Sequence, residues 1–144
     1  MCHRPGDLYR PGRYEDVDLC FRAWKKGWNG YYVPASDQHH EGGTSFGRVF
    51  GSEETKSMVF RNAHLFMVKN IRDPFWLARC FFFLFIKFFI GLLLPKYRFM
   101  AKGARNFLVR LPQAIAKRKE QKKEKFVRTD REVVAMLTGA ENGF

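Results

Sequence analysis

The stretch Arg13-Tyr14-Glu15-Asp16-Val17-Asp18-Leu19-Cys20-Phe21-Arg22 decides how the first half of the chain is interpreted. Three carboxylates fall within four residues, at the point where an amphipathic helix is expected to begin. Apolar residues then recur at i, i+3, i+4, i+7 and i+11, which predicts a helix over residues 16–26 that packs on a core through one face. The residues of that face are Val17, Cys20, Phe21, Trp24 and Trp28.

Glu15 and Asp16 lie at the N-terminus of this predicted helix, where backbone amides and the helix dipole stabilise negative charge. A carboxylate held there can cap the helix, bind a metal or accept a proton from a substrate. Asp16 and Asp18 are about 200° apart around a helix, so both cannot point at one substrate atom. If Asp16 is catalytic, we expect Asp18 to be structural. The local sequence alone favours a simpler interpretation, in which the three carboxylates are ordinary acidic residues at a helix N-terminus.

The charge of the chain is strongly basic and unevenly distributed. Of 144 residues, 26 are Lys or Arg and 14 are Asp or Glu, which gives a formal net charge of +12 and a pI near 10.0. Cations dominate from Lys96 to Arg131, and 16 residues are Phe. Such a chain suits nucleic acid or an anionic membrane surface. The phenylalanine-rich segment described below favours the membrane and argues against nucleic acid.

The cysteines and the first residues bear on the compartment. Cys2, Cys20 and Cys80 are odd in number, far apart and form no CxxC pair, which indicates a reducing compartment. Residues 1–13 are polar, contain two Pro-Gly turn signals and lack the apolar core of a signal peptide, so we expect a loop there.

Two short extended segments and a long helix are expected next. Residues 30–34, Gly-Tyr-Tyr-Val-Pro, predict a strand that stops at proline, and a second extended piece is expected over residues 36–40. A glycine-rich loop, residues 41–47, follows. Ser52, with Glu53 and Glu54 after it, predicts the N-cap of a helix that runs to about Asn70. This helix is expected to bury Val59, Phe60, Ala63, Phe66 and Met67.

Residues 75–94 form an apolar segment long enough to cross a membrane. Only Arg79, Lys87 and Gly91 among its 20 residues are not apolar, and a helix of this length spans roughly 30 Å. Lys87 lies near the centre, where a cation costs about 3 kcal/mol. A membrane-spanning helix, an in-plane or re-entrant helix and a buried soluble helix are therefore three open alternatives.

Residues 96–119 predict a basic amphipathic helix, kinked or restarted at Pro112, that suits the headgroup layer of an anionic leaflet. The positive-inside rule places it at the cytoplasmic face of the cell membrane. Beyond about residue 118, a flexible, solvated basic tail is expected. The predicted organisation is thus a first domain over residues 1–72, membrane-associated helices over residues 73–118 and a tail over residues 119–144.

The order of these motifs resembles a known family. The segments that carry the resemblance are Tyr14 to Cys20, the helix ending in Gly27-Trp28, Tyr31-Tyr32-Val33-Pro34, and His40-Glu41-Gly42-Gly43-Thr44-Ser45. Together they resemble the C-terminal half of the catalytic domain of family 2 glycosyltransferases, in particular the bacterial rhamnosyltransferase-like branch that builds cell-envelope polysaccharides. The match covers about residues 13–47, and Phe60-Arg61-Asn62 with Val68-Lys69-Asn70 resembles the helix that follows.

The resemblance implies a GT-A fold, an α/β domain that binds a nucleotide-sugar and usually a divalent metal, Mn²⁺ or Mg²⁺. It implies inverting transfer of a sugar to a glycan or lipid-linked acceptor, with Asp16 as the general base and Glu15 orienting the acceptor or the adjacent loop. His40 would lie near the metal or the diphosphate, and as a ligand it suits Mn²⁺ better than Mg²⁺. Gly42, Gly43, Thr44 and Ser45 would close over the leaving diphosphate.

The chain departs from the family in two respects. The N-terminal half of the family domain, which holds the first nucleotide-binding strands and the acidic metal motif, has no counterpart here. In addition, residues 5–12 stand where the family has a Gly-Gly-Phe-Asp-like segment. We therefore expect a C-terminal fragment that depends on a donor-binding half. The alternative is a catalytically inactive, membrane-associated interaction module derived from such an enzyme.

Overall fold

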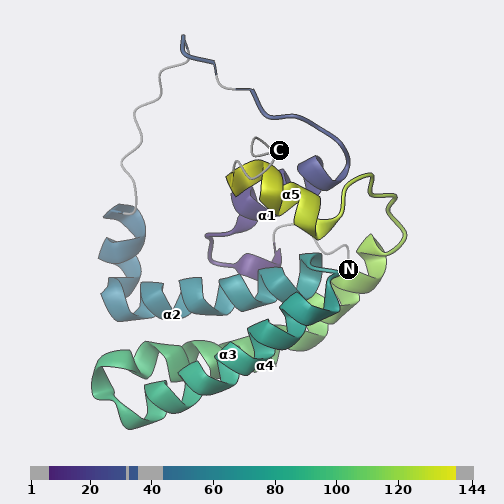
Figure 1. Cartoon of the computed structure of the whole chain (residues 1–144). Coiled ribbons are helices and arrows are strands. Elements are labelled where there is room, and N and C mark those ends of the chain that lie inside the picture. Colours follow the sequence, from purple (N-terminus) through teal and green to yellow (C-terminus); the bar gives the residue numbers. More distant parts are fainter. Residues whose placement is uncertain (1–6, 32, 36–43, 139–144) are drawn as a thin grey trace.

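The computed structural model describes residues 7–31, 33–35 and 44–138, and these residues are helical and contain no strand (Figure 1). A 3-10 turn precedes the first helix, and another joins α3 to α4. The elements are η1 (Asp7–Tyr9), α1 (Glu15–Lys25), α2 (Thr44–Asn70), α3 (Pro74–Leu93), η2 (Pro95–Tyr97), α4 (Arg98–Gln121) and α5 (Asp130–Thr138).

The prediction of an α/β, GT-A-type domain is wrong for the described part of the chain. Gly30, Tyr31, Val33 and Pro34, expected as a strand, have no regular structure, and the Tyr31 side chain is 84% exposed. A strand requires a neighbour that pairs with its backbone groups, and the described residues provide none. The second extended piece, residues 36–40, lies outside the described residues.

The long helix α2 is the centre of the molecule. A hairpin made of α3 and α4 lies along one side of α2, and α1 with α5 lies on the other (Figure 1). Phe107 of α4 is completely buried, and the centre of its ring lies 6.0 Å from that of the His64 ring on α2 where these two helices pack together. Burial of such apolar surface is the main favourable term in folding, so the α2–α4 contact is the core of this fold.

Two glycines allow the helices to approach closely. A Cβ atom on Gly91 would lie 2.6 Å from the backbone nitrogen of Ala101, which shows how tightly α3 and α4 pack near their connection. A Cβ atom on Gly103 would lie 2.8 Å from the carbonyl oxygen of Ser57 and 2.8 Å from Cδ1 of Phe60. The packing of α4 against α3 therefore depends on glycine at position 91, and its packing against α2 depends on glycine at position 103.

The predicted helix ending near Asn70 is present, but it starts earlier than expected. α2 begins at Thr44 and is interrupted at Gly51, where φ is 73° and the backbone is not helical. Ser52, the expected N-cap, is the first residue after this kink. Phe60 and Phe66 are buried as predicted, whereas Val59, Ala63 and Met67 are half-buried.

The first helix is also present, but its buried face differs from the prediction. Val17 and Cys20 are exposed, and Trp28 is 67% exposed. The buried side chains of α1 are Asp18, Phe21 and Lys25, at i, i+3 and i+7. Counting apolar residues failed here because both charged side chains find buried partners of opposite charge, as described below.

The C-terminal half contains three helices. Pro112 lies inside α4 without ending it, and α3 is the one helix of the described residues that is long and apolar enough to cross a membrane. The region expected to be a flexible tail contains α5. Val133 of α5 is completely buried, and Asp130 at its start is also buried.

Gly103 provides a test of the helix packing. Replacing glycine by alanine inside a helix normally stabilises it by up to about 1 kcal/mol. We expect Gly103→Ala instead to lower the free energy of unfolding by about 1–3 kcal/mol, because the new methyl group meets the Ser57 carbonyl and α4 must move. Urea denaturation measures this, with exposed Gln113→Ala on the same helix as the control. A Gly103→Ala protein more stable than the wild type would contradict the packing.

Candidate functional site

Glu15 and Asp16 lie in the first turn of α1, and both side chains are exposed. Oδ1 of Asp16 accepts a hydrogen bond from the backbone nitrogen of Val17 at 2.8 Å. Within the described residues, Oδ2 of Asp16 has no hydrogen-bond partner. The structure therefore presents one carboxylate oxygen of Asp16 to solvent at the positive end of the helix.

Asp18, two residues later, is in the opposite situation. Its side chain is buried, and Oδ1 accepts hydrogen bonds from the Tyr9 hydroxyl at 2.8 Å, Lys69 Nζ at 2.7 Å and Asn70 Nδ2 at 2.6 Å. Oδ2 accepts from Lys69 Nζ at 2.6 Å and Arg22 Nε at 3.1 Å. The expectation that Asp18 is structural is confirmed by these contacts.

The surroundings of Asp18 keep it ionised. Burial alone would raise the pKa of its carboxyl, but the Lys69 ammonium and the hydrogen bonds from Lys69, Asn70 and Tyr9 outweigh burial and hold that pKa below its usual value. The lowered pKa stabilises the fold above about pH 4, where an unfolded aspartate is ionised. This contribution is lost as the pH falls through the lower pKa of the folded protein.

Tyr9 remains a donor to Asp18 at every physiological pH. Burial, followed by the negative charge of Asp18, raises the pKa of the Tyr9 phenol far above its ordinary range. The hydroxyl therefore stays protonated, and its 2.8 Å hydrogen bond joins the 3-10 turn η1 to α1.

The turn that leads into α1 has an unusual backbone. Arg13 and Tyr14 have φ values of 68° and 82°, in the left-handed region that residues with a side chain rarely adopt. Such conformations cost on the order of 1–3 kcal/mol each and persist only where the surroundings fix them. They occur immediately before Glu15-Asp16. Contacts with the rest of the protein, and not the local backbone preference, therefore fix the direction in which α1 starts.

Asn62 of α2 fixes this turn. Its Nδ2 lies 3.0 Å from the carbonyl oxygen of Tyr9 and 2.9 Å from those of Gly12 and Arg13. Arg61 donates from Nε to Asn62 Oδ1 at 2.9 Å and from Nη2 to the carbonyl of Arg10 at 2.6 Å. The two N–H groups of one buried amide on α2 are thus within hydrogen-bond distance of three backbone carbonyls of the turn before Asp16.

Two dipeptides of α2 therefore position the acidic helix start: Arg61-Asn62 holds the turn, and Lys69-Asn70 holds Asp18. Both were part of the family resemblance, but sequence reasoning gave them no role. The available signal was spacing, because Asn62 and Lys69 are seven residues apart and lie on one face of a helix. Polar residues on a predicted core face are informative in this way.

The other end of α1 is fixed by a second buried ion pair. Lys25 Nζ lies 2.5 Å from Oδ1 of Asp130 and donates to the Asn70 carbonyl at 3.2 Å. Oδ2 of Asp130 accepts from the backbone nitrogens of Arg72 at 2.5 Å and Asp73 at 2.8 Å. The ammonium of Lys25 also lies 4.7 Å from the centre of the Phe126 ring. Both ends of α1 are thus tied to the C-terminus of α2.

The remaining predicted site residues are not brought into this arrangement. His40, Gly42 and Gly43 lie outside the described residues, and Thr44 and Ser45 form the first turn of α2. Across residues 7–31, 33–35 and 44–138, no group of three or more His, Cys, Asp or Glu side chains comes together. Both oxygens of Asp18 are bonded to Lys69 Nζ, so this carboxylate is not available to a metal ion.

Comparisons with known proteins give no relative for this chain. No family model, no curated protein and no solved structure matches it. The family resemblance stated from the motifs therefore remains a prediction.

The Asp18–Lys69 pair can be tested by a double-mutant cycle. Asp18→Asn should lower the free energy of unfolding by about 3–5 kcal/mol, because it leaves the Lys69 ammonium buried without a counter-charge. Adding Lys69→Met should restore part of the loss, and Arg22→Ala, which removes the more exposed partner, should cost about 1 kcal/mol or less. Chemical denaturation is measured for the wild type, the Asp18→Asn and Lys69→Met single variants, their double variant and Arg22→Ala. Additive losses in the double variant would show that the two side chains do not interact.

Proposed function

We propose that this chain belongs to an inverting glycosyltransferase, in which Asp16 deprotonates the acceptor hydroxyl during transfer from a nucleotide-sugar to a glycan or lipid-linked acceptor. The observation that supports this most directly is the contrast between two neighbouring carboxylates. Asp18 is buried and fully bonded, whereas Asp16 is exposed with Oδ2 free to receive a proton. In this proposal Asp18 anchors α1, and Asp16 faces the acceptor.

The chemistry requires a base that is accessible and fixed in direction. In the proposed step, the acceptor oxygen forms a bond to the anomeric carbon as the bond to the nucleoside diphosphate breaks, and Oδ2 of Asp16 takes the hydroxyl proton. The turn held by Asn62 and the anchor at Asp18 supply the fixed direction.

Donor binding is assigned in this proposal to polypeptide outside the described residues. The described residues bring together no group of His, Cys, Asp or Glu side chains that could hold a metal, but α1 exposes apolar side chains close to Asp16. Val17 is 46% exposed, Leu19 is 60% exposed, and Cys20 beside them is exposed as well. Val17 and Cys20 are three residues apart and share one face of α1, and Cys20 follows Asp16 by four residues, so this exposed face adjoins the proposed base. A donor-binding polypeptide seated there would bring the sugar to the base.

The proposal predicts a selective effect of Asp16→Asn in the full open reading frame that contains this chain. Loss of the base should reduce the turnover number by about 10²- to 10⁴-fold while the affinity for the nucleotide-sugar changes little. Turnover is measured with radiolabelled donor, and donor affinity by calorimetry. Glu15→Gln, which keeps the proposed base, should cost far less. Wild-type turnover in Asp16→Asn would remove this residue from the mechanism.

A second candidate function is supported by a different observation. The outer surface of α3 is apolar and exposed, which fits an interaction module at the cytoplasmic face of the cell membrane whether or not transfer occurs. A full-length protein that binds membranes but neither binds a nucleotide-sugar nor transfers sugar would favour this second function.

A further inference from the structure

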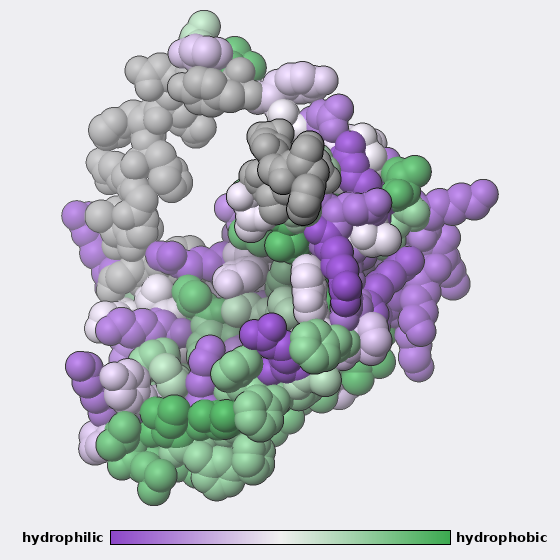
Figure 2. Space-filling model, in the orientation of Figure 1, coloured by the Kyte–Doolittle hydropathy of each residue, from purple (hydrophilic) through white to green (hydrophobic). Residues whose placement is uncertain are grey.

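Helix α3 exposes a stripe of large aromatic side chains. Phe75, Phe82 and Phe85 are each about 60% exposed, and Phe89 and Leu93 continue the stripe at helical spacing. The space-filling view shows the resulting apolar surface on the α3–α4 hairpin (Figure 2). A soluble monomer rarely leaves a contiguous apolar area of this kind open to water.

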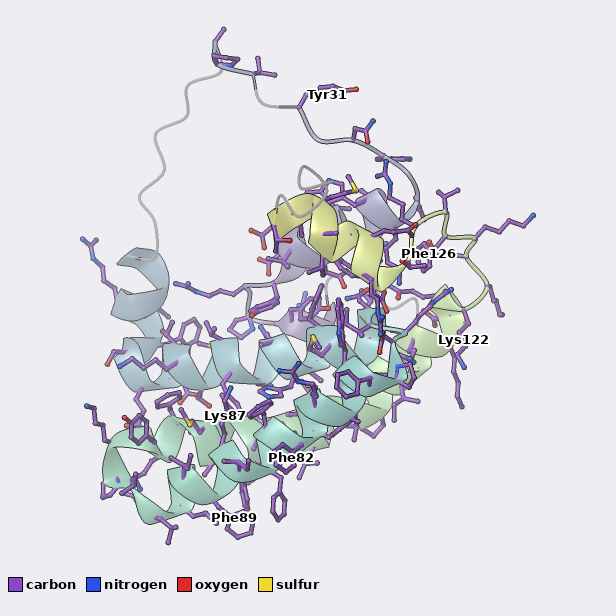
Figure 3. All side chains as sticks on the ribbon, in the orientation of Figure 1. Tyr31, Phe82, Lys87, Phe89, Lys122 and Phe126 are labelled. Carbon is purple, nitrogen blue, oxygen red and sulfur yellow. The ribbon has the colours of Figure 1, made fainter. Side chains whose placement is uncertain are left out.

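Lys87 of α3 is turned away from this stripe, whereas the guanidinium of Arg79 lies 5.9 Å from the centre of the Phe75 ring at one end of it. Lys87 follows Phe82 by five residues, which is roughly 140° around the helix. It lies between α3 and α2, whereas Phe82 and Phe89 point away from α2 (Figure 3). Its Nζ lies 5.9 Å from the centre of the Phe60 ring of α2. Lys87 is therefore in the middle of the apolar segment in sequence, but its side chain lies on the face of α3 opposite the exposed phenylalanines.

The side chain of Lys87 lines a cavity that also contains other polar side chains. A cavity of about 410 Å³ between α2 and α3 is lined by Lys87, Arg79 and His64, together with aromatic and apolar side chains. Burial, and to a smaller extent the Lys87 ammonium, lowers the pKa of His64, so its ring is neutral near pH 7. The side of α3 that faces α2 therefore carries both cations of this helix among aromatic and apolar side chains, and it is the more polar side of α3.

Helix α4 places cations at the edge of the apolar surface. Arg98 and Arg105 line a groove together with Phe88, Leu92 and Leu108, so their charges stand beside the exposed apolar residues. Between them, Lys102 is ion-paired with Glu54 of α2. A second groove of about 250 Å³, almost wholly apolar, runs between the two helices and has Phe85 in its wall.

The arrangement combines an apolar stripe with a flanking row of arginines. Residues 74–119, which make up α3 and nearly all of α4, contain ten Lys or Arg and no Asp or Glu. This charge complements the anionic headgroups of a cytoplasmic leaflet, whose acyl chains lie directly below them. Glu53 of α2 also lines the groove that holds Arg98 and Arg105, so the rim is positive on balance. A protein partner would need a shape that matches both the aromatic stripe and these arginines, whereas a bilayer surface needs no specific shape.

We propose that α3 lies in the plane of an anionic membrane surface, with Phe75, Phe82, Phe85 and Phe89 inserted among the lipids and Arg98 and Arg105 on the headgroups. In this orientation α2 and the Asp16 site remain in the aqueous phase above the bilayer. A membrane-spanning α3 would have to leave α2 and carry Lys87 into hydrocarbon, which is unfavourable. This inference does not depend on glycosyl transfer.

Vesicle binding tests the surface. The full chain should sediment with vesicles of phosphatidylcholine containing about a third phosphatidylserine, and much less with phosphatidylcholine alone. Phe82→Ser with Phe89→Ser should weaken this binding at least tenfold, and Arg98→Gln with Arg105→Gln should weaken it about tenfold and reduce its salt dependence. Circular dichroism checks that each variant remains helical.

The control uses apolar residues that are equally exposed but lie elsewhere. Tyr31→Ser with Leu137→Ser changes side chains that are 84% and 56% exposed, on the loop after α1 and on α5. Vesicle binding should be unchanged by this pair. An equal loss in both pairs, or no binding of the wild type to anionic vesicles, would overturn the proposal. The proposal would also be overturned if the wild type formed oligomers in lipid-free buffer and only the phenylalanine substitutions dissociated them, because the stripe would then join copies of the chain.

A depth measurement distinguishes the in-plane helix from a spanning one. Nitroxide labels are attached one at a time to Phe75→Cys, Phe82→Cys and Phe89→Cys in a chain whose native cysteines are replaced by alanine. For an in-plane helix, all three labels should report the same shallow depth on vesicles. A spanning helix rises about 10 Å over each seven residues, so depths that change steadily along the series would contradict the proposal.

Transfer activity and membrane docking can fail separately in these experiments. Loss of transfer in Asp16→Asn should leave vesicle binding intact, because Asp16 lies on α1, on the other side of α2 from the stripe (Figure 1). Vesicle binding without any transfer activity would overturn the proposed enzyme and leave the docking surface standing.

Discussion

The ion pair between Asp18 and Lys69 is the interaction on which the arrangement of the N-terminal part depends. The carboxylate joins η1, α1 and the end of α2 through Tyr9, Lys69 and Asn70. A buried pair of this kind adds little net stability relative to an apolar pair of the same size, since desolvation offsets its attraction. Its effect is directional, because α1 can face α2 in only one rotation, and that rotation leaves Asp16 in solvent.

How far sequence alone predicts this molecule varies along the chain. The helices ending near Lys25 and Asn70 and the apolar helix after Pro74 follow from periodicity and capping. The buried face of α1 does not, because Asp18 and Lys25 are inside only through partners 51 and 105 positions away. Long-range compensation of this kind has no local signature. The strand expected from Tyr31 and Val33 is absent, because β-propensity has no effect without a neighbouring strand.

The candidate site shows the same division. Local pattern and resemblance marked Asp16 and assigned Asp18 to structure, and the hydrogen bonds of Asp18 agree. Neither revealed that Asn62 contacts three carbonyls of the turn before Asp16, because its seven-residue spacing from Lys69 marks a shared helix face but not the partners of that face. On α3, the sequence left the role of Lys87 open, and only packing against α2 shows that the helix has a polar side. The two proposed surfaces therefore lie on opposite sides of α2.

The central claim is that Asp18 is an ionised anchor held by Lys69. The most direct measurement is a pH titration of the Asp18 side-chain carbon by NMR in the folded protein. The carboxyl should keep the chemical shift of an ionised aspartate as the pH falls through 4, because Lys69, Asn70 and Tyr9 hold its pKa below the usual value. A midpoint near 3.9, the value of an unperturbed aspartate, would contradict the account.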